Sequence, residues 1–339
     1  NRIIKYTSTV AGASIFLMFT SIAIRGVGFL REIIFAKEFG LSKEFDVYLI
    51  ASIIPITTNT VIYFIGQNFF IPYYSQISAE DKLKSFQFLR SSLLSFGIIG
   101  LFLGVIFLLF AQSIISIFIN SSSPIEDSAL SIFRLFALSI PIASYISIIS
   151  AYLNKEKRFL PPAFSSLCLN LIVILSVMVL NSKIGITSIA IGYLVGSVAQ
   201  LIYLFYSSEI KNIIFSNNKN YNWRLTDIAN SSLFMIIIIE SIGQFYSIAD
   251  RFFFSSVREG GISAINYAQI LVSLPISIIA IPLSTALFPK ISDDLYGTSS
   301  IGIELTLKDS IKVTLLIFIP VFYIFNFFGI DIISLLLQR

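Results

Sequence analysis

Two arginines, Arg25 and Arg31, lie six residues apart in an apolar stretch near the start of the chain. A charge at the centre of a membrane costs roughly 2.5–3.5 kcal/mol, so a charge that is retained there suggests a function. Guanidinium groups bind phosphate through paired hydrogen bonds, and two of them suit a diphosphate. The pair therefore predicts binding of an anionic lipid headgroup. The alternative for Arg31 is a side chain that snorkels to the membrane interface.

The spacing of the two arginines requires a distorted helix if both are to face one cavity. Positions six apart do not share a face of an ideal α-helix. Gly26 and Gly28 lie between them, and glycine can kink or unwind a helix. We therefore expect a local distortion of the helix at these glycines.

A second group of charged residues lies in a later apolar stretch. Asp250 and Arg251 are adjacent, and Glu240 precedes them by ten residues. Arg251 would add a cation to the headgroup site, whereas Asp250 or Glu240 would bind Na⁺ or H⁺ as a coupling ion. The alternative for Asp250 and Arg251 is a structural ion pair, and the alternative for Glu240 is pairing inside the bundle.

Several further polar residues accompany the predicted membrane helices. Asp46 begins a helix, where a carboxylate suits the positive end, so we favour a capping role over substrate binding. The amides of Asn59 and Gln269 suit hydrogen bonds to sugars, or equally bonds between helices. The same two interpretations apply to Gln67, Asn68, Asn170, Gln200 and Gln244. We expect Arg134 to snorkel to the interface.

Composition excludes most soluble classes of protein. A soluble domain is about 45–50% apolar and about 25% charged, whereas this chain of 339 residues is 56% hydrophobic and 12% charged, with a mean hydropathy of +0.87. These values exclude a cytosolic enzyme, a disordered chain and a nucleic-acid binder. The sequence has no His and a single Cys, Cys168, which excludes His-based catalysis, an internal disulfide and a Cys-cluster zinc site. No P-loop, nucleophile elbow or metal motif is present. We therefore expect that the protein is not an enzyme and has no catalytic residue. We also expect that it binds no metal and no cofactor other than a coupling ion.

The elements that must position these residues are membrane helices. About 20 mostly apolar residues cross a bilayer, and about nine such stretches are present. They are 7–29, 47–71, 87–112, 129–152, 161–181, 185–206, 229–256, 263–288 and 311–330. Bends that suit alternating access are expected at Pro55, Pro141, Pro275 and Pro282.

Lysine and arginine are distributed unevenly between the loops. With a cytoplasmic N-terminus, every inner loop is basic, and the inner loops together hold most of the 23 Lys and Arg residues. The outer loop around 120–127 has no Lys or Arg. The positive-inside rule therefore predicts a multi-pass membrane protein with its N-terminus in the cytoplasm. The basic loops fit anionic membrane lipids and require no nucleic acid.

The chain resembles itself at a shift of 220 residues. Arg31 falls on Arg251, Gly40 on Gly260, and Pro55 on Pro275. Because the shift spans six predicted helices, the two copies share one orientation, as in two-lobed transporters.

The predicted fold is an all-α, polytopic membrane helix bundle with two lobes related by a parallel six-helix repeat. We expect an N-lobe over 1–206, a cytoplasmic linker over 207–228 and the start of a C-lobe over 229–339. The second lobe would be truncated after three helices, so we expect the chain to be a fragment of a longer protein.

Four segments carry motifs that are specific when taken together. They are Arg25 to Glu32 with Phe39-Gly40 and Asp46; Leu153 to Phe159 with Pro162 to Phe164 and Asn170; Asp250 to Phe253 with Gly260 to Ala268, Leu274-Pro275 and Leu287 to Pro289; and Leu335 to Arg339. The chain resembles the MurJ/MviN family of lipid II flippases, which belongs to the multidrug/oligosaccharidyl-lipid/polysaccharide exporter superfamily.

The resemblance implies a V of two six-helix lobes that exports polyprenyl-diphosphate-linked saccharides across the bacterial inner membrane by alternating access. It would serve peptidoglycan or cell-surface polysaccharide synthesis, with membrane lipids and cell-envelope synthesis enzymes as partners. By position, Arg25 and Arg31 match arginines of the family's cationic cavity. Asp46 matches its helix-2 aspartate, and Asp250 matches a carboxylate linked to sodium in some members.

The chain departs from the family pattern at two cavity arginines. Their regions read Thr57-Thr58-Asn59 and Ala268-Gln269-Ile270-Leu271 here. The expected cargo is therefore lipid II or a related lipid-linked oligosaccharide. Arg25, Arg31, Arg251, Asp46, Asn59 and Gln269 are the candidate binding residues.

Two other functions are alternatives to the flippase. A cation-coupled multidrug exporter of the same superfamily would carry acidic residues in its N-lobe cavity, whereas the first six predicted helices hold no Asp or Glu at mid-membrane. A non-transporting scaffold for envelope synthesis would tolerate the loss of Arg25 and Arg31.

Overall fold

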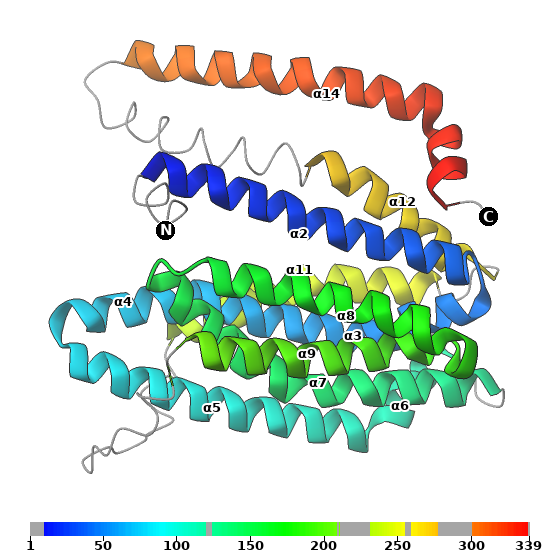
Figure 1. The fold of residues 1–339 in the computed structure, drawn as a ribbon, viewed down its shortest axis with the longest axis horizontal. Helices are drawn as coiled ribbons and strands as arrows, with labels where there is room; N and C mark the ends of the chain where they lie inside the picture. The colour runs from blue at the N-terminus through cyan, green and yellow to red at the C-terminus, as the bar shows by residue number, and fades with distance from the viewer. Residues whose placement is uncertain are drawn as a thin grey trace. The chain divides into compact units, whose positions relative to one another are not determined.

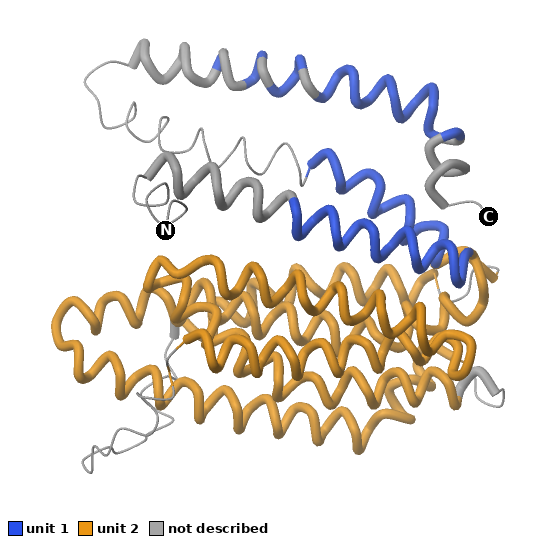
Figure 2. Tube along the Cα trace, viewed as in Figure 1, with its two compact units in different colours: residues 1–40, 263–339 blue, residues 41–262 orange. Residues whose placement is uncertain are grey.

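A computed structural model describes residues 10–119, 124–208, 210, 231–254, 259–276 and 300–337. Every regular element in these ranges is helical (Figure 1), as the apolar stretches predict. The chain divides into two compact units (Figure 2). The central unit is 41–262, and the terminal unit joins 1–40 to 263–339.

The helix bounds follow the predicted stretches with extensions at their ends. The central unit contains α3 (Lys43–Ile65), η1 (Gly66–Phe70), α4 (Ile71–Glu80), α5 (Lys82–Leu109), α6 (Ala111–Phe118), α7 (Pro124–Lys155), α8 (Leu160–Ile184), α9 (Thr187–Ser207) and α11 (Ser231–Phe254). The terminal unit contains α2 (Val10–Phe39), most of α12 (Gly261–Pro275) and α14 (Ser300–Leu337).

Six helices within the described residues are long and apolar enough to cross a membrane, which makes this a multi-pass membrane protein. They cover 43–80, 82–109, 127–155, 160–184, 187–207 and 233–254, and they match six of the predicted spans. The predicted spans 7–29 and 311–330 fall largely within α2 and α14. The span 263–288 begins in α12 but continues past residue 276, and Pro282 lies outside the described residues.

The core of the central unit forms where α3, η1, α5 and α7 meet. Phe70, Leu89 and Ile148 are fully buried there. At η1 the α-helix widens into a π-helical turn. A side chain at Gly66 would overlap with Ser147 of α7, whose hydroxyl donates to the Ile62 carbonyl at 2.8 Å. The missing side chain therefore lets α7 approach the backbone of α3 closely.

Small residues also set the contacts of α5 with α7 and of α8 with α9. A side chain at Gly100 of α5 would overlap with Ser144 of α7, and one at Gly104 would lie in tight contact with Ala137 and Pro141. Gly192 of α9 makes an equally close approach to α8. Close backbone contact through small residues is the usual way in which membrane helices associate.

The helix that carries the two N-terminal arginines is not unwound. α2 is continuous from Val10 to Phe39, through Gly26 and Gly28. Of the two expected distortions, the unwinding is therefore wrong and the kink stays a prediction. The membrane gives the physical reason for the intact helix. Broken backbone hydrogen bonds in lipid cost several kcal/mol each, and a glycine by itself does not force the break.

The turns at corresponding places in the two repeat copies share an unusual backbone. Gly40 after α2 has φ +56° and Gly260 after α11 has φ +82°. Only glycine adopts this left-handed region readily. The predicted lobes 1–206 and 229–339 are grouped differently here, because α11 packs against α3 inside the central unit. The lobe boundaries stay a prediction, and most of the linker 207–228 lies outside the described residues.

Candidate functional site

Asp46 connects the two repeat copies within the central unit. It lies in the first turn of α3 and is 7% exposed. Its carboxylate Oδ2 accepts the backbone N–H of Gly260 at 2.6 Å. Since α12 begins at Gly261, this carboxylate binds the positive start of a helix from the second copy.

Asp46 lies in the first turn of α3, where its charge suits the positive end of the helix as expected, but it is not the N-cap. Ser42 is the N-cap of α3, and its hydroxyl accepts the N–H of Phe45 at 3.2 Å. Serine at this position satisfies an N-terminal donor of the helix. The Asp46 carboxylate is thereby left to serve the start of α12 instead.

Gly260 is required for this contact by its backbone as well as by space. Besides its positive φ, a Cβ on Gly260 would lie 2.6 Å from the Leu41 carbonyl oxygen. The turn after α11 therefore sits directly against the residue that precedes the N-cap of α3. A larger residue at Gly260 would move the N–H away from Asp46.

Arg251 places a buried cation beside the same carboxylate. It lies near the end of α11 and is 9% exposed. Its guanidinium interacts electrostatically with Asp250, Asp46 and Tyr48. A buried charge is tolerated when an opposite charge compensates it. The central unit thus brings together Asp46, Asp250 and Arg251, three of the residues predicted to form the site.

Arg31, in the terminal unit, is engaged by its neighbours on α2. Its Nε lies 3.1 Å from Glu32 Oε1, and its Nη2 pairs with the same oxygen. The guanidinium also lies 5.6 Å from the centre of the Phe35 ring, a cation–π distance. The Arg31 side chain is 19% exposed, which is more buried than a side chain that snorkels into water.

Arg25 differs from Arg31 in its surroundings. It is partly buried on α2, and no residue in the described ranges is recorded as its hydrogen-bond or ion-pair partner. In the terminal unit, the hydroxyl of Tyr267 on α12 donates a hydrogen bond to the carbonyl oxygen of Gly40, just after the end of α2, at 3.5 Å.

The amides near the middle of α3 and in η1 bond between helices. Asn59 Nδ2 donates to Ser139 Oγ at 3.1 Å, and Gln67 Oε1 accepts from Asn154 Nδ2 at 3.1 Å. One atom of each amide, Asn59 Oδ1 and Gln67 Nε2, is buried without a partner among the described residues. The interhelical interpretation therefore describes both residues in this conformation.

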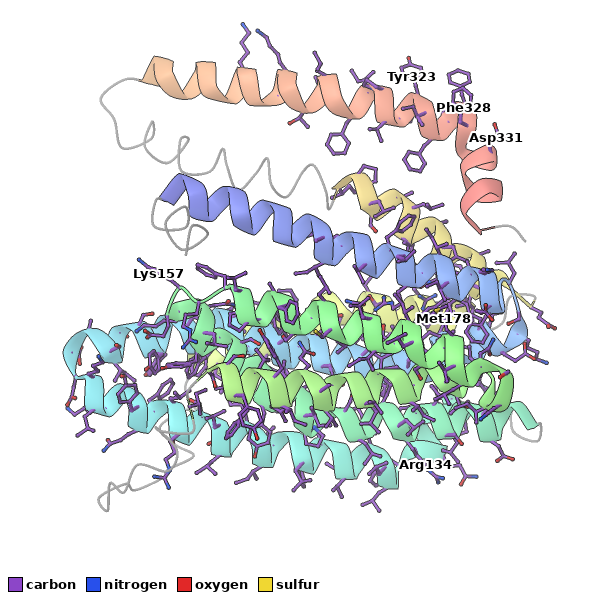
Figure 3. All side chains as sticks on the ribbon, in the orientation of Figure 1. Arg134, Lys157, Met178, Tyr323, Phe328 and Asp331 are labelled. Carbon is purple, nitrogen blue, oxygen red and sulfur yellow. The ribbon has the colours of Figure 1, made fainter. Side chains whose placement is uncertain are left out.

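The other candidates stand apart from this cluster. Gln269 is exposed on α12, and Glu240 is partly buried on α11. Arg134 is exposed on α7 (Figure 3), as expected for a snorkelling side chain. Sequence reasoning missed Gly260 as the partner of Asp46, although the repeated glycine was a signal that could have found it.

Comparisons with known proteins establish the family of the chain. The sequence profile of the family described as "Lipid II flippase MurJ" matches residues 35–339. A "Probable lipid II flippase MurJ" of Borreliella burgdorferi is 25% identical over 96% of the chain and 65% of that relative. A "Lipid II flippase MurJ" of Thermosipho africanus is 32% identical over 60% of the chain and 41% of the relative. The chain thus spans less than two thirds of these curated relatives.

Solved structures agree on the fold. A structure described as "Lipid II flippase MurJ, inward closed conformation" superposes with a TM-score of 0.78 at 28% identity, over 95% of this chain and 68% of that one. An inward-facing multidrug resistance transporter of the MATE family gives a TM-score of 0.69 at 15% identity, over 94% and 75%. The second likeness shows the fold alone. The family profile covers nearly all of the chain, so the chain belongs to the lipid II flippase MurJ family of membrane transporters.

Proposed function

We propose that this chain acts as a flippase for polyprenyl-diphosphate-linked saccharides. The cargo is lipid II or a related lipid-linked oligosaccharide. Transport crosses the bacterial inner membrane by alternating access and serves peptidoglycan or cell-surface polysaccharide synthesis. The family membership supports this class of cargo, and the arginines supply cations that fit a diphosphate.

One observation carries the mechanism: the hydrogen bond from the Gly260 N–H to the Asp46 carboxylate. Asp46 belongs to the first repeat copy and Gly260 to the second. With the N-terminus in the cytoplasm, as the loop charges predict, this bond lies at the outer end of the helices. It therefore holds that end closed while cargo enters from the cytoplasm, and it must break before release outside.

The headgroup-binding step is assigned to the arginines of α2. Arg25 has no recorded partner within the described residues, so it needs no prior ion pair to be broken. Arg31 would exchange Glu32 for phosphate oxygens, and Arg251 would add a third cation. Asn59 and Gln269 would bond the sugars.

Cycling is proposed to use a Na⁺ or H⁺ gradient through Asp250 or Glu240. Asp250 interacts electrostatically with Arg251, so a coupling ion at Asp250 would compete with that cation. The carboxylates come from α11 alone, and the first six predicted helices offer none at mid-membrane. This favours the flippase over a cation-coupled multidrug exporter. Membrane lipids and envelope synthesis enzymes would be its neighbours.

Native mass spectrometry of the protein purified from its own membranes tests the proposal. We expect a retained lipid whose mass fits a polyprenyl diphosphate carrying a saccharide. We expect it to be lost in Arg25→Ala and kept in Arg134→Ala, a matched exposed arginine. Retention of bulk phospholipid alone, under conditions that keep a known MurJ loaded, would overturn the flippase and favour the drug exporter or the scaffold.

A further inference from the structure

The central unit carries a cavity that the proposed transport path does not use. Its volume is about 660 Å³, within the about 300–1,000 Å³ of small-molecule sites. It is lined by Arg90, Leu93 and Leu94 of α5, Tyr145 and Ile149 of α7, and Leu201, Ile202, Phe205 and Tyr206 of α9. We propose that this groove binds an anionic phospholipid of the cytoplasmic leaflet, with an acyl chain in the groove and the phosphate beside Arg90.

The groove has a buried floor and open walls. Ile149 and Leu93 are 2% and 5% exposed, whereas Leu94 and Ile202 are 42% and 52% exposed. Exposed leucine and isoleucine on helices that span a membrane face lipid rather than water. The floor can therefore receive an acyl chain that enters from the surrounding bilayer without any helix having to move.

The groove lies on the opposite side of α7 from the candidate functional site. Ser139 and Ser147 of α7 bond to α3, and α3 carries Asp46. At 100° per residue, the face with Tyr145 and Ile149 is turned by about 140° from that face. A cargo that passes along α3 would not reach the groove, so its occupant is a lipid of the bilayer rather than the transported molecule.

The charges at one end of the groove select an anionic headgroup. Arg90 lies two turns into α5, and Tyr206 lies in the last turn of α9. Next to Tyr206, Ser207 accepts a hydrogen bond through its carbonyl from Arg158 at 2.7 Å. With the predicted orientation, this end faces the cytoplasm. Basic pockets between membrane helices on that side bind anionic lipid headgroups, and an exposed tyrosine suits the interface.

The polar lining offers a second anchor below the headgroup. The Tyr145 ring lies against Gly97 of α5, where any side chain would overlap with its hydroxyl. No partner for this hydroxyl is recorded within the described residues. A phospholipid ester carbonyl would accept its proton, which a purely apolar occupant could not do.

Photo-crosslinking in vesicles tests the proposal. The full chain is reconstituted in phosphatidylcholine with a small fraction of phosphatidylglycerol that carries a diazirine in its acyl chain, and labelled peptides are mapped. We expect labels on 90–94 and 201–206. Arg90→Gln should reduce them about fivefold, because one basic residue near anionic lipid contributes about 1 kcal/mol, whereas Arg90→Lys should keep them.

A second variant tests the groove without touching its charge. Leu201→Trp fills the groove and should abolish the labels, whereas Val179→Trp, at an exposed position of α8 that does not line the groove, should leave them unchanged. Equal labelling by a diazirine phosphatidylcholine would overturn the anionic headgroup. Stronger labelling by a photoactivatable polyprenyl diphosphate would overturn the phospholipid in favour of the cargo's tail. Labels spread evenly over α5 and α9 would overturn the site.

Discussion

Arg251 on α11 and Arg25 on α2 are both arginines of apolar helices, but their surroundings differ. Arg251 is buried among Asp250, Asp46 and Tyr48 in the central unit. Arg25 is only partly buried, and no hydrogen-bond or ion-pair partner is recorded for it within the described residues. A membrane cation that has its own carboxylates stabilises a conformation. A cation that lacks such carboxylates is suited to bind an anionic ligand reversibly.

The largest expected effect is on stability, from Arg251→Ala. Arg251 is a buried cation that interacts electrostatically with Asp250 and Asp46, and removing a charge that compensates a buried charge costs about 3–5 kcal/mol. Asp250 and Asp46 would both lose their cation. We expect a much lower unfolding midpoint in detergent, measured by a thermal-shift assay, and partial recovery in Arg251→Ala with Asp250→Asn. Arg134→Ala is the matched control, and an equal loss of stability there would contradict the structural role of Arg251.

Arg25→Ala should have the opposite signature, a loss of binding with little change in stability. Charged hydrogen bonds contribute about 1.5–3 kcal/mol, which corresponds to about a ten- to hundredfold weaker affinity for the proposed lipid-linked saccharide. Affinity is measured by titration in native mass spectrometry, with the melting curve as a second readout. If Arg25→Ala melts as early as Arg251→Ala, the contrast between the two arginines is wrong.

Asp46→Asn should shift the balance between conformations. The amide still accepts a hydrogen bond from Gly260 but lacks the charge, and charge-assisted bonds are about twice as strong as neutral ones. We expect the outer end to open more often. Ile262 is buried beside this turn, so the thiol of an Ile262→Cys variant, in a Cys168→Ser background, should react faster with an impermeant maleimide applied from outside.

The matched control for Asp46→Asn is Glu44→Gln, which removes an exposed carboxylate from the same turn of α3. It should leave the labelling rate unchanged. Equal acceleration by both changes would mean that charge in the first turn, rather than the bond to Gly260, controls the opening.

The comparison also shows what sequence can and cannot predict in this chain. Apolar length predicted the membrane helices well, because a bilayer imposes a minimum span. Expected unwinding at Gly26 and Gly28 was wrong, because lipid penalises broken backbone bonds more than glycine favours them. The partner of Asp46 lies 214 residues away, and local patterns do not encode such a contact. The repeat, which places Gly40 on Gly260, was a signal that could have indicated it, but the contact was not predicted.

The smallest expected effect comes from Ser42→Ala, which separates capping of α3 from the bond between Asp46 and Gly260. Ser42→Ala removes the cap of α3 and should cost about 0.5–2 kcal/mol. Because the Asp46 carboxylate binds the start of α12, loss of the α3 cap should leave that bond in place. We therefore expect the maleimide labelling rate of the Ile262→Cys thiol to rise no more than the slightly lower melting temperature explains. Ser42→Asp, which restores a capping side chain, should recover the melting temperature. If Ser42→Ala opens the outer end as much as Asp46→Asn does, then the first turn of α3 acts as one element, and the closing role belongs to that turn rather than to the carboxylate.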